Sequence, residues 1–202
     1  MTITRRIALG GLLLGPLPLG AALAQSPPVR YRATVEGLDG DTLSFTVRGG
    51  GAVKAALTAE TTVTAVVPAK LEDIKPGSFI GTAAMPGPDG SLVALEVHVF
   101  PEAMRGTGEG HRPFDLKPDS TMTNGTVGDV VGTMGRTLKV GYKGGEKTVQ
   151  VPEDAPVVSF EPGGRELLTK DAHIIVFATK AADGTVTAQR VLVGKDGLVP
   201  PM

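Results

Sequence analysis

Short runs in which hydrophobic and polar residues alternate recur over residues 30–194, and Gly and Pro separate them. Such runs, rich in Val, Thr and aromatic residues, are typical of β-strands. In the first half they predict strands over 31–38, 42–48, 53–57 and 62–67. The run 71–74, closed by Lys75-Pro76-Gly77, is long enough for only one helical turn, and 165–168 is its counterpart. The pattern therefore predicts an all-β chain.

The second half of the chain repeats the pattern of the first. Residues 78–84 align with 172–178 at an offset of 94, and Asp89-Gly90 then falls on Asp183-Gly184 without a gap. Two copies of one unit account for nearly all of the globular part. We expect a first barrel repeat at 30–100, a connector at 101–123, a second barrel repeat at 124–194 and a C-terminal tail at 195–202, whose residues 197–202 are too short to form an element.

Each copy is expected to end in a hairpin. If Asp89-Gly90 is a two-residue turn, residues whose numbers sum to 179 face each other. The core side then carries Ile80, Thr82, Ala84, Leu95, Val97 and Val99, and the other side carries Gly81, Ala83, Met85, Ala94, Glu96 and His98. In the second copy the other side carries the apolar Ile175, Phe177 and Leu192. We therefore expect the first unit or a partner to cover that side.

The N-terminus has the pattern of a signal peptide over residues 1–24. Arg5 and Arg6 precede an apolar stretch, and Ala22-Leu23-Ala24 supplies the small-x-small cleavage pattern. The stretch is too short, and too interrupted by Gly and Pro, to span a bilayer as a helix. These features predict a periplasmic or secreted protein. The paired arginines fit twin-arginine export, and the ordinary Sec route stays open.

Charge and cysteine content narrow the classes of partner. Loss of Arg5 and Arg6 with residues 1–24 changes the formal net charge from −1 to −3, and no basic run remains. This balance argues against nucleic acid as a partner. The absence of Cys excludes disulfides, thiolate chemistry and a lipoprotein anchor. We therefore expect no membrane anchor.

Two segments carry a resemblance to a known family. Residues 73–81 (DIKPGSFIG) and 88–99 (PDGSLVALEVHV), with the order of strands, resemble an exported bacterial repeat family called domain of unknown function 5666. The resemblance implies two tandem small OB-like β-barrel repeats, each with one short helical turn, after the signal peptide. It implies no catalytic residue, and the connector does not belong to the family pattern.

The connector is the expected site of function because it concentrates polar side chains in a long segment with little periodicity. Arg105, His111 and Arg112 would supply hydrogen-bond donors, and Glu109 and Asp115 lie among them. We predict a non-enzymatic binding or adaptor protein whose ligand, a periplasmic protein or a small anion, meets this loop and the adjoining barrel face. A structural strap or tether is the plainer interpretation of the same segment.

A metal-handling function is the main alternative. His111, helped by a carboxylate or by Met104, could bind copper or another divalent ion, although the spacing matches no established zinc or calcium loop. No other cofactor is expected. The chain contains no nucleophile elbow, zinc-protease, Walker or dinucleotide motif, and nothing orients His111 as a general base.

Overall fold

The computed structural model describes residues 28–131 and 136–202, which form twelve β-strands and a few 3₁₀ turns. The all-β prediction is confirmed. The predicted single turns at 71–74 and 165–168 are 3₁₀ turns at Leu71–Asp73 and Arg165–Leu167. The expected signal peptide lies outside the described residues. Within the described part, no helix has the length and apolar character needed to cross a membrane.

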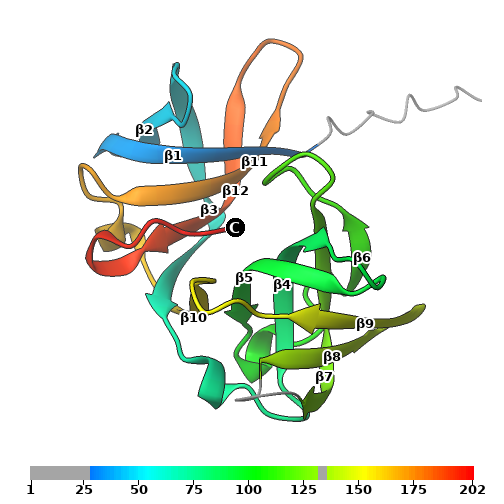
Figure 1. Ribbon diagram of the computed structural model, residues 1–202. Coiled ribbons are helices and arrows are strands. Elements are labelled where there is room, and N and C mark those ends of the chain that lie inside the picture. Colours follow the sequence, from blue (N-terminus) through cyan, green and yellow to red (C-terminus); the bar gives the residue numbers. More distant parts are fainter. Residues whose placement is uncertain (1–27, 132–135) are drawn as a thin grey trace, which may run out of the picture.

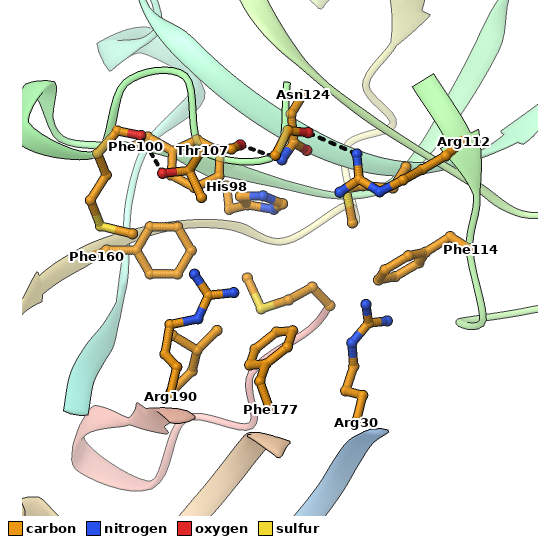
Figure 2. Close-up of a pocket in the computed structure, with 15 residues that line it drawn as sticks. Arg30, His98, Phe100, Thr107, Arg112, Phe114, Asn124, Phe160, Phe177 and Arg190 are labelled. Carbon is orange, nitrogen blue, oxygen red and sulfur yellow. Dashed lines mark hydrogen bonds between the residues drawn. The ribbon is translucent and has the colours of Figure 1, made fainter. Parts of the chain in front are cut away.

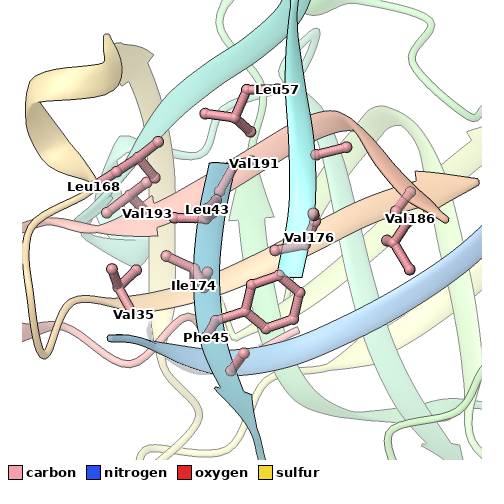
Figure 3. Packing of buried hydrophobic residues seen from close by; sticks show 14 residues of the cluster. Val35, Leu43, Phe45, Leu57, Leu168, Ile174, Val176, Val186, Val191 and Val193 are labelled. Atoms are coloured by element: carbon pink, nitrogen blue, oxygen red, sulfur yellow. The ribbon is translucent and has the colours of Figure 1, made fainter. Parts of the chain in front are cut away.

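A first closed barrel contains five strands, which lie together in Figure 1. Three form an antiparallel meander, β1 (Pro28–Asp39), β2 (Thr42–Val47) and β3 (Ala52–Pro68). The other two form a hairpin, β11 (His173–Lys180) and β12 (Val186–Gly194). β11 pairs antiparallel with β1, and β12 pairs parallel with β3, which closes the barrel. Its core includes Leu43, Phe45, Ile174, Val176 and Val191 (Figure 3).

A second barrel has the same arrangement. Its meander is β7 (Thr121–Val131), β8 (Thr137–Tyr142) and β9 (Gly145–Gln150), and its hairpin is β4 (Phe79–Pro86) and β5 (Leu92–Val99). β4 pairs antiparallel with β7, and a short parallel pairing of β5 with β9 closes the barrel. Its core includes Ile80, Val97, Leu138 and Val140.

The two halves of the chain exchange their hairpins. The expectation that 30–100 and 124–194 would each close on themselves is wrong, because the meander of each half pairs with the hairpin of the other half. The two hairpins present similar core faces, with Ile80, Ala84 and Val97 in one and Ile174, Ala178 and Val191 in the other. Local sequence therefore gives little preference for either pairing.

The connection after β3 takes the chain from one barrel to the other. The sequence predicts separate strands at 53–57 and 62–67, but both lie in β3. The end of β3 pairs with β12 on one side and with β10 (Val157–Pro162) on the other. β10 also pairs parallel with β5. The chain thus leaves β3 beside the second barrel, which places the following hairpin there.

The hairpin register is confirmed away from the turn and wrong near it. From Ile80↔Val99 to Ala83↔Glu96, facing residues have the expected sum of 179. A β-bulge after Ala83 shifts the pairing by one, and a longer loop closed by the Gly87 N–H and the Ser91 carbonyl contains Asp89-Gly90. As a result Ala94 is buried and Leu95 is only half-buried. The other hairpin has a matching bulge after Phe177.

A third apolar cluster joins the two barrels. Ile175 and Leu192, from the outer side of the second hairpin, pack with Phe79, Phe100 and other buried apolar residues, namely Val66, Val158, Phe160 and Met202. The prediction that this side is covered is confirmed, and the cover comes from the chain itself. The tail begins with a 3₁₀ turn at Lys195–Gly197, and its last residue, Met202, is buried in the cluster.

The connector at 101–123 is more ordered than a loop. It contains a 3₁₀ turn at Glu102–Met104 and a short strand, β6 (Gly110–Pro113), and its last residues already belong to β7. β6 pairs antiparallel with β7 outside the closed barrel. Periodicity gave no signal for β6 because it has only four residues, two of them Gly110 and Pro113.

Disulfide cross-linking tests the exchange of hairpins. Thr34 in β1 faces His173 in β11, and their side chains are 3.3 Å apart at Oγ1 and Nδ1. Because the chain has no Cys, Thr34→Cys/His173→Cys should form one intramolecular disulfide on mild oxidation, measured by mass spectrometry. The matched pair Thr34→Cys/Phe79→Cys, with Phe79 at the position 94 residues before His173, would link β1 to its own half and should stay reduced. Efficient closure of the second pair alone would contradict the exchange.

Two glycines of β7 should respond differently to substitution by Ala. A Cβ at Gly125 would lie 2.3 Å from the Gly141 carbonyl oxygen, whereas the nearest atom to a Cβ at Gly128 is 3.9 Å away. Since backbone cannot easily yield, Gly125→Ala should lower the free energy of unfolding by about 1–3 kcal/mol. Gly128→Ala should change it by less than about 1 kcal/mol. Urea unfolding measures both, and equal effects would contradict this packing.

Candidate functional site

A cavity of about 110 Å³ lies between the two barrels. The outer sides of the two hairpins supply opposite walls, and the connector and the C-terminal residue complete it (Figure 2). Its apolar lining comes from four phenylalanines, three methionines and a leucine, namely Phe100, Phe114, Phe160, Phe177, Met104, Met122, Met202 and Leu192. Its polar lining includes Arg30, Arg112, Arg190, His98 and Asn124, and no Asp or Glu is among the described residues that line it.

Strand register builds the basic wall of the cavity. Arg30 of β1 faces Phe177 of β11, and Phe177 in turn faces Arg190 of β12. These three side chains therefore form one row across three neighbouring strands. The Phe177 ring lies between the guanidinium groups, 4.2 Å from Cζ of Arg190 and 5.3 Å from Cζ of Arg30. Cation–π contacts of this kind hold both arginines against the aromatic wall.

The connector holds one end of this row through Phe114 and Asp115. Cζ of Arg30 lies 4.5 Å from the centre of the Phe114 ring. The Asp115 carboxylate accepts hydrogen bonds from Arg30, at 2.5 Å, and from Arg32, at 2.9 and 3.1 Å. The bonds from Arg32 and the positive charge of Arg30 hold the pKa of Asp115 below its ordinary value, against the effect of burial. One carboxylate thus accepts hydrogen bonds from two arginines.

The other two arginines of the cavity have no carboxylate partner. Within residues 28–131 and 136–202, neither Arg112 nor Arg190 forms an ion pair. Arg112 donates to the Gly108 carbonyl. Burial lowers the pKa of Arg190, and the neighbouring charge of Arg30 lowers it further. Because arginine stays protonated in proteins, this wall keeps an excess of positive charge.

The opposite wall carries a row of polar residues from the second barrel. His98 of β5 and Asn124 of β7 both face Gly81 of β4 in the strand register. Glu96 lies behind His98, with Oε2 2.9 Å from His98 Nδ1 and Oε1 accepting the Ala83 N–H at 2.7 Å. Glu96 is fully buried, and His98 and Asn124 are each only 4% exposed. Burial and these contacts fix the orientation of the His98 ring.

Aromatic rings surround His98 and join the polar wall to the apolar one. The centre of its ring lies 4.9 Å from that of Phe100 and 5.6 Å from that of Phe160, in both cases edge to face. Edge-to-face packing favours one ring orientation. His98 is therefore a positioned cavity residue rather than a mobile one.

The structure brings only part of the predicted site to the cavity. Arg112 and Met104 line it, and Asp115 holds its basic wall. Arg105 instead pairs with Glu102 and donates to the Gly77 carbonyl. Glu109, whose carboxylate accepts the Lys143 N–H, lines no part of the cavity.

His111, the proposed metal ligand, also lies outside the cavity lining. Its Nδ1 is 2.8 Å from Thr123 Oγ1, and its ring stacks on Tyr142 with centres 6.0 Å apart. Burial and the charge of Lys147 lower the pKa of His111. In the part of the chain that the structure describes, no three His, Asp or Glu side chains gather as metal ligands would. The geometry therefore offers no support for the His111 metal site.

Sequence reasoning missed most of the cavity residues. Gly81, Glu96 and His98 were expected together on the outer side of one hairpin, which is correct, but that side was not recognised as a site. Arg30, Arg190 and Asn124 carry no motif, and they meet only because the hairpins are exchanged. The available signal was the polar pair Glu96 and His98 on the otherwise apolar strand β5.

Comparison with known proteins identifies no relative. No protein-family model matches this sequence, and no curated protein or solved structure is detectably similar to it.

The pairing of Asp115 with two arginines should make stability depend on pH. The pKa of Asp115 is lower in the folded chain than in the unfolded chain, where it is about 4. The contribution of Asp115 to the free energy of unfolding is therefore complete above about pH 4, and it is lost as the pH falls through the pKa of the folded state. Asp115→Asn should lower the free energy of unfolding at pH 7 by less than about 1 kcal/mol, since the carboxylate is half exposed. The difference should vanish in acid.

Chemical denaturation at pH 7 and at about pH 2.5 measures this difference. Asp129→Asn is the matched control, because Asp129 is exposed and forms no ion pair with any described residue. A difference for Asp115→Asn that persists in acid would show that packing rather than charge is responsible.

Proposed function

We propose that this protein is a non-enzymatic binding protein for a small organic anion with an apolar body, held in the cavity between the barrels. The binding site is the cavity that the connector helps to form, rather than the connector alone. Arg112 and Met104 remain in it, and Arg30 and Arg190 replace Arg105 as the main donors.

One observation carries the proposal: three arginines, but no Asp or Glu side chain among the described residues, line a largely apolar cavity. Buried or half-buried charge of one sign is costly unless it is paired. Burial and the nearby charge of Arg30 both disfavour the charged form of Arg190 and lower its pKa. A bound anion would offset both effects, because it would give Arg190 a partner of opposite charge. Guanidinium groups also bind carboxylates through two parallel hydrogen bonds.

The size and lining of the cavity favour a small molecule over a protein segment. An engineered apolar cavity of about 150 Å³ is known to hold benzene. The volume here, about 110 Å³, therefore suits one aromatic ring or a short aliphatic chain. Arg112 is exposed as well as lining the cavity, so part of a ligand could extend past it to the surface.

The enzyme and metal hypotheses gain no comparable support. No nucleophile beside His98 is apparent among the residues that line the cavity, since the Thr107 hydroxyl donates to the Met104 carbonyl. His111 contacts Thr123 and Tyr142 instead of other metal-binding side chains.

We also propose that the protein is exported and that its two barrels arose by duplication of one unit. The charged start, apolar stretch and small-x-small site of residues 1–24 support a periplasmic or secreted protein. Duplication of an OB-like unit, as in the family that the sequence resembles, is supported by the identical pairing order of the two barrels. The bulges after Ala83 and Phe177 also differ by the same 94 residues as the sequence repeat.

Binding of simple carboxylates tests the proposal. Titration of the purified protein with benzoate, phenylacetate and hexanoate, followed by calorimetry or NMR, should give dissociation constants of about 1 mM or below for at least one of them. Acetate, which lacks the apolar body, should bind more weakly. Arg190→Gln should weaken binding about tenfold or more, because it removes a charged donor.

Arg48→Gln is the matched control, because Arg48 is exposed on the first barrel and does not line the cavity. Circular dichroism and thermal unfolding confirm that each variant is folded. Failure of all three carboxylates to bind at 10 mM, about ten times the expected constant, would overturn the proposal. Equal weakening by Arg190→Gln and Arg48→Gln would also overturn it.

A further inference from the structure

The polar wall of the cavity presents two hydrogen-bond acceptors side by side. A Cβ at Gly81 would lie 2.0 Å from His98 Nε2 and 2.6 Å from Asn124 Oδ1. The two atoms are therefore no more than 4.6 Å apart, above a position where the chain has no side chain. Glycine at position 81 leaves room for the His98 ring and the Asn124 amide, because a Cβ there would collide with both.

The orientation of the Asn124 amide follows from its one hydrogen bond. Its Nδ2 donates to the Thr107 carbonyl at 2.9 Å, and a carbonyl can only accept, so Oδ1 must lie on the other side. Oδ1 is buried and has no hydrogen-bond partner among the described residues. Such a group is rare in folded proteins, and it calls for a specific explanation.

The tautomer of His98 follows from Glu96. The Glu96 carboxylate already accepts the Ala83 N–H, and its other oxygen faces His98 Nδ1 at 2.9 Å. Nδ1 therefore carries the proton and donates to Glu96. In the neutral ring Nε2 is then an acceptor. No described residue donates to Nε2, so both atoms beside Gly81 lack a donor.

We infer that the ligand carries an O–H or N–H donor on its apolar body, which binds Asn124 Oδ1 and His98 Nε2 while its carboxylate faces the arginines. This inference rests on the proposed function and narrows it to hydroxy- or amino-substituted carboxylates. The two walls of the cavity then recognise opposite ends of one molecule: Arg30 and Arg190 the anion, Asn124 and His98 the donor.

Tight binding should require the O–H or N–H donor of the ligand, because the polar wall presents acceptors that need a donor. A ligand that brings an apolar group to this wall would leave the buried Asn124 Oδ1 and the neighbouring His98 Nε2 without partners. An unpaired buried polar group lowers affinity by a factor of about ten or more. A site built to bind a hydroxyl group rejects analogues that lack it much more strongly than an apolar pocket rejects an added hydroxyl.

Matched benzoates test this inference in the unaltered protein. The 3- and 4-hydroxybenzoates and 4-aminobenzoate carry a donor, whereas 4-methylbenzoate has nearly the same shape without one. At least one donor compound should bind about tenfold or more tightly than 4-methylbenzoate. The hydroxy and amino compounds distinguish the two sources of the donor. NMR should also show a shift of the His98 Nε2 resonance with the donor compound and a smaller one with 4-methylbenzoate.

Asn124→Leu should remove most of this preference, and Arg48→Gln should keep it. If Asn124→Leu does not fold, the comparison of ligands and the His98 resonance in the unaltered protein still decide the question. Equal affinity for the methyl and donor compounds would overturn the inference and leave the proposed anion site standing. Absence of binding by every benzoate, including the unsubstituted one, would count against both.

Discussion

The packing of the two hairpins against each other is the constraint on which the rest of the molecule depends. Each barrel has its own core, but Ile175 and Leu192 of one hairpin belong to a separate cluster with Phe79 and Phe100 of the other half. Burial of this outer side stabilises the pair of barrels through the hydrophobic effect. It also fixes where the polar residues on the same faces lie, and the cavity forms beside the cluster.

Within that contact, the strand register arranges the polar residues. Arg30, Phe177 and Arg190 form one cross-strand row, and His98, Gly81 and Asn124 form the other. The β-bulges lie directly after Ala83 and Phe177, whose partners are Glu96 and Arg190. Bulges redirect side chains and often occur next to functional sites. A shift of one residue in either register would turn these groups into the barrel cores.

The two walls differ in their electrostatics. On one, Arg30 and Arg190 stack on Phe177, and Asp115 compensates only Arg30 among the arginines of the cavity. On the other, the Glu96 carboxylate accepts a hydrogen bond from His98 Nδ1, and Asn124 Oδ1 is a buried acceptor without a partner among the described residues. The connector supplies both Asp115 and the Thr107 carbonyl that orients Asn124. Its contribution is thus to position groups on both walls more than to bind a ligand by itself.

The sequence alone determined the class of fold, most of the strands, the single turns and the register of the hairpins away from their turns, because alternation of side chains and turn residues are local properties. It also placed Gly81, Glu96 and His98 on one face. Only the tertiary structure decided which hairpin closes which barrel, since the two have equivalent core faces. Arg30, Asn124 and Arg190 are distant in sequence and come together only through that choice, so no local pattern could have shown the site.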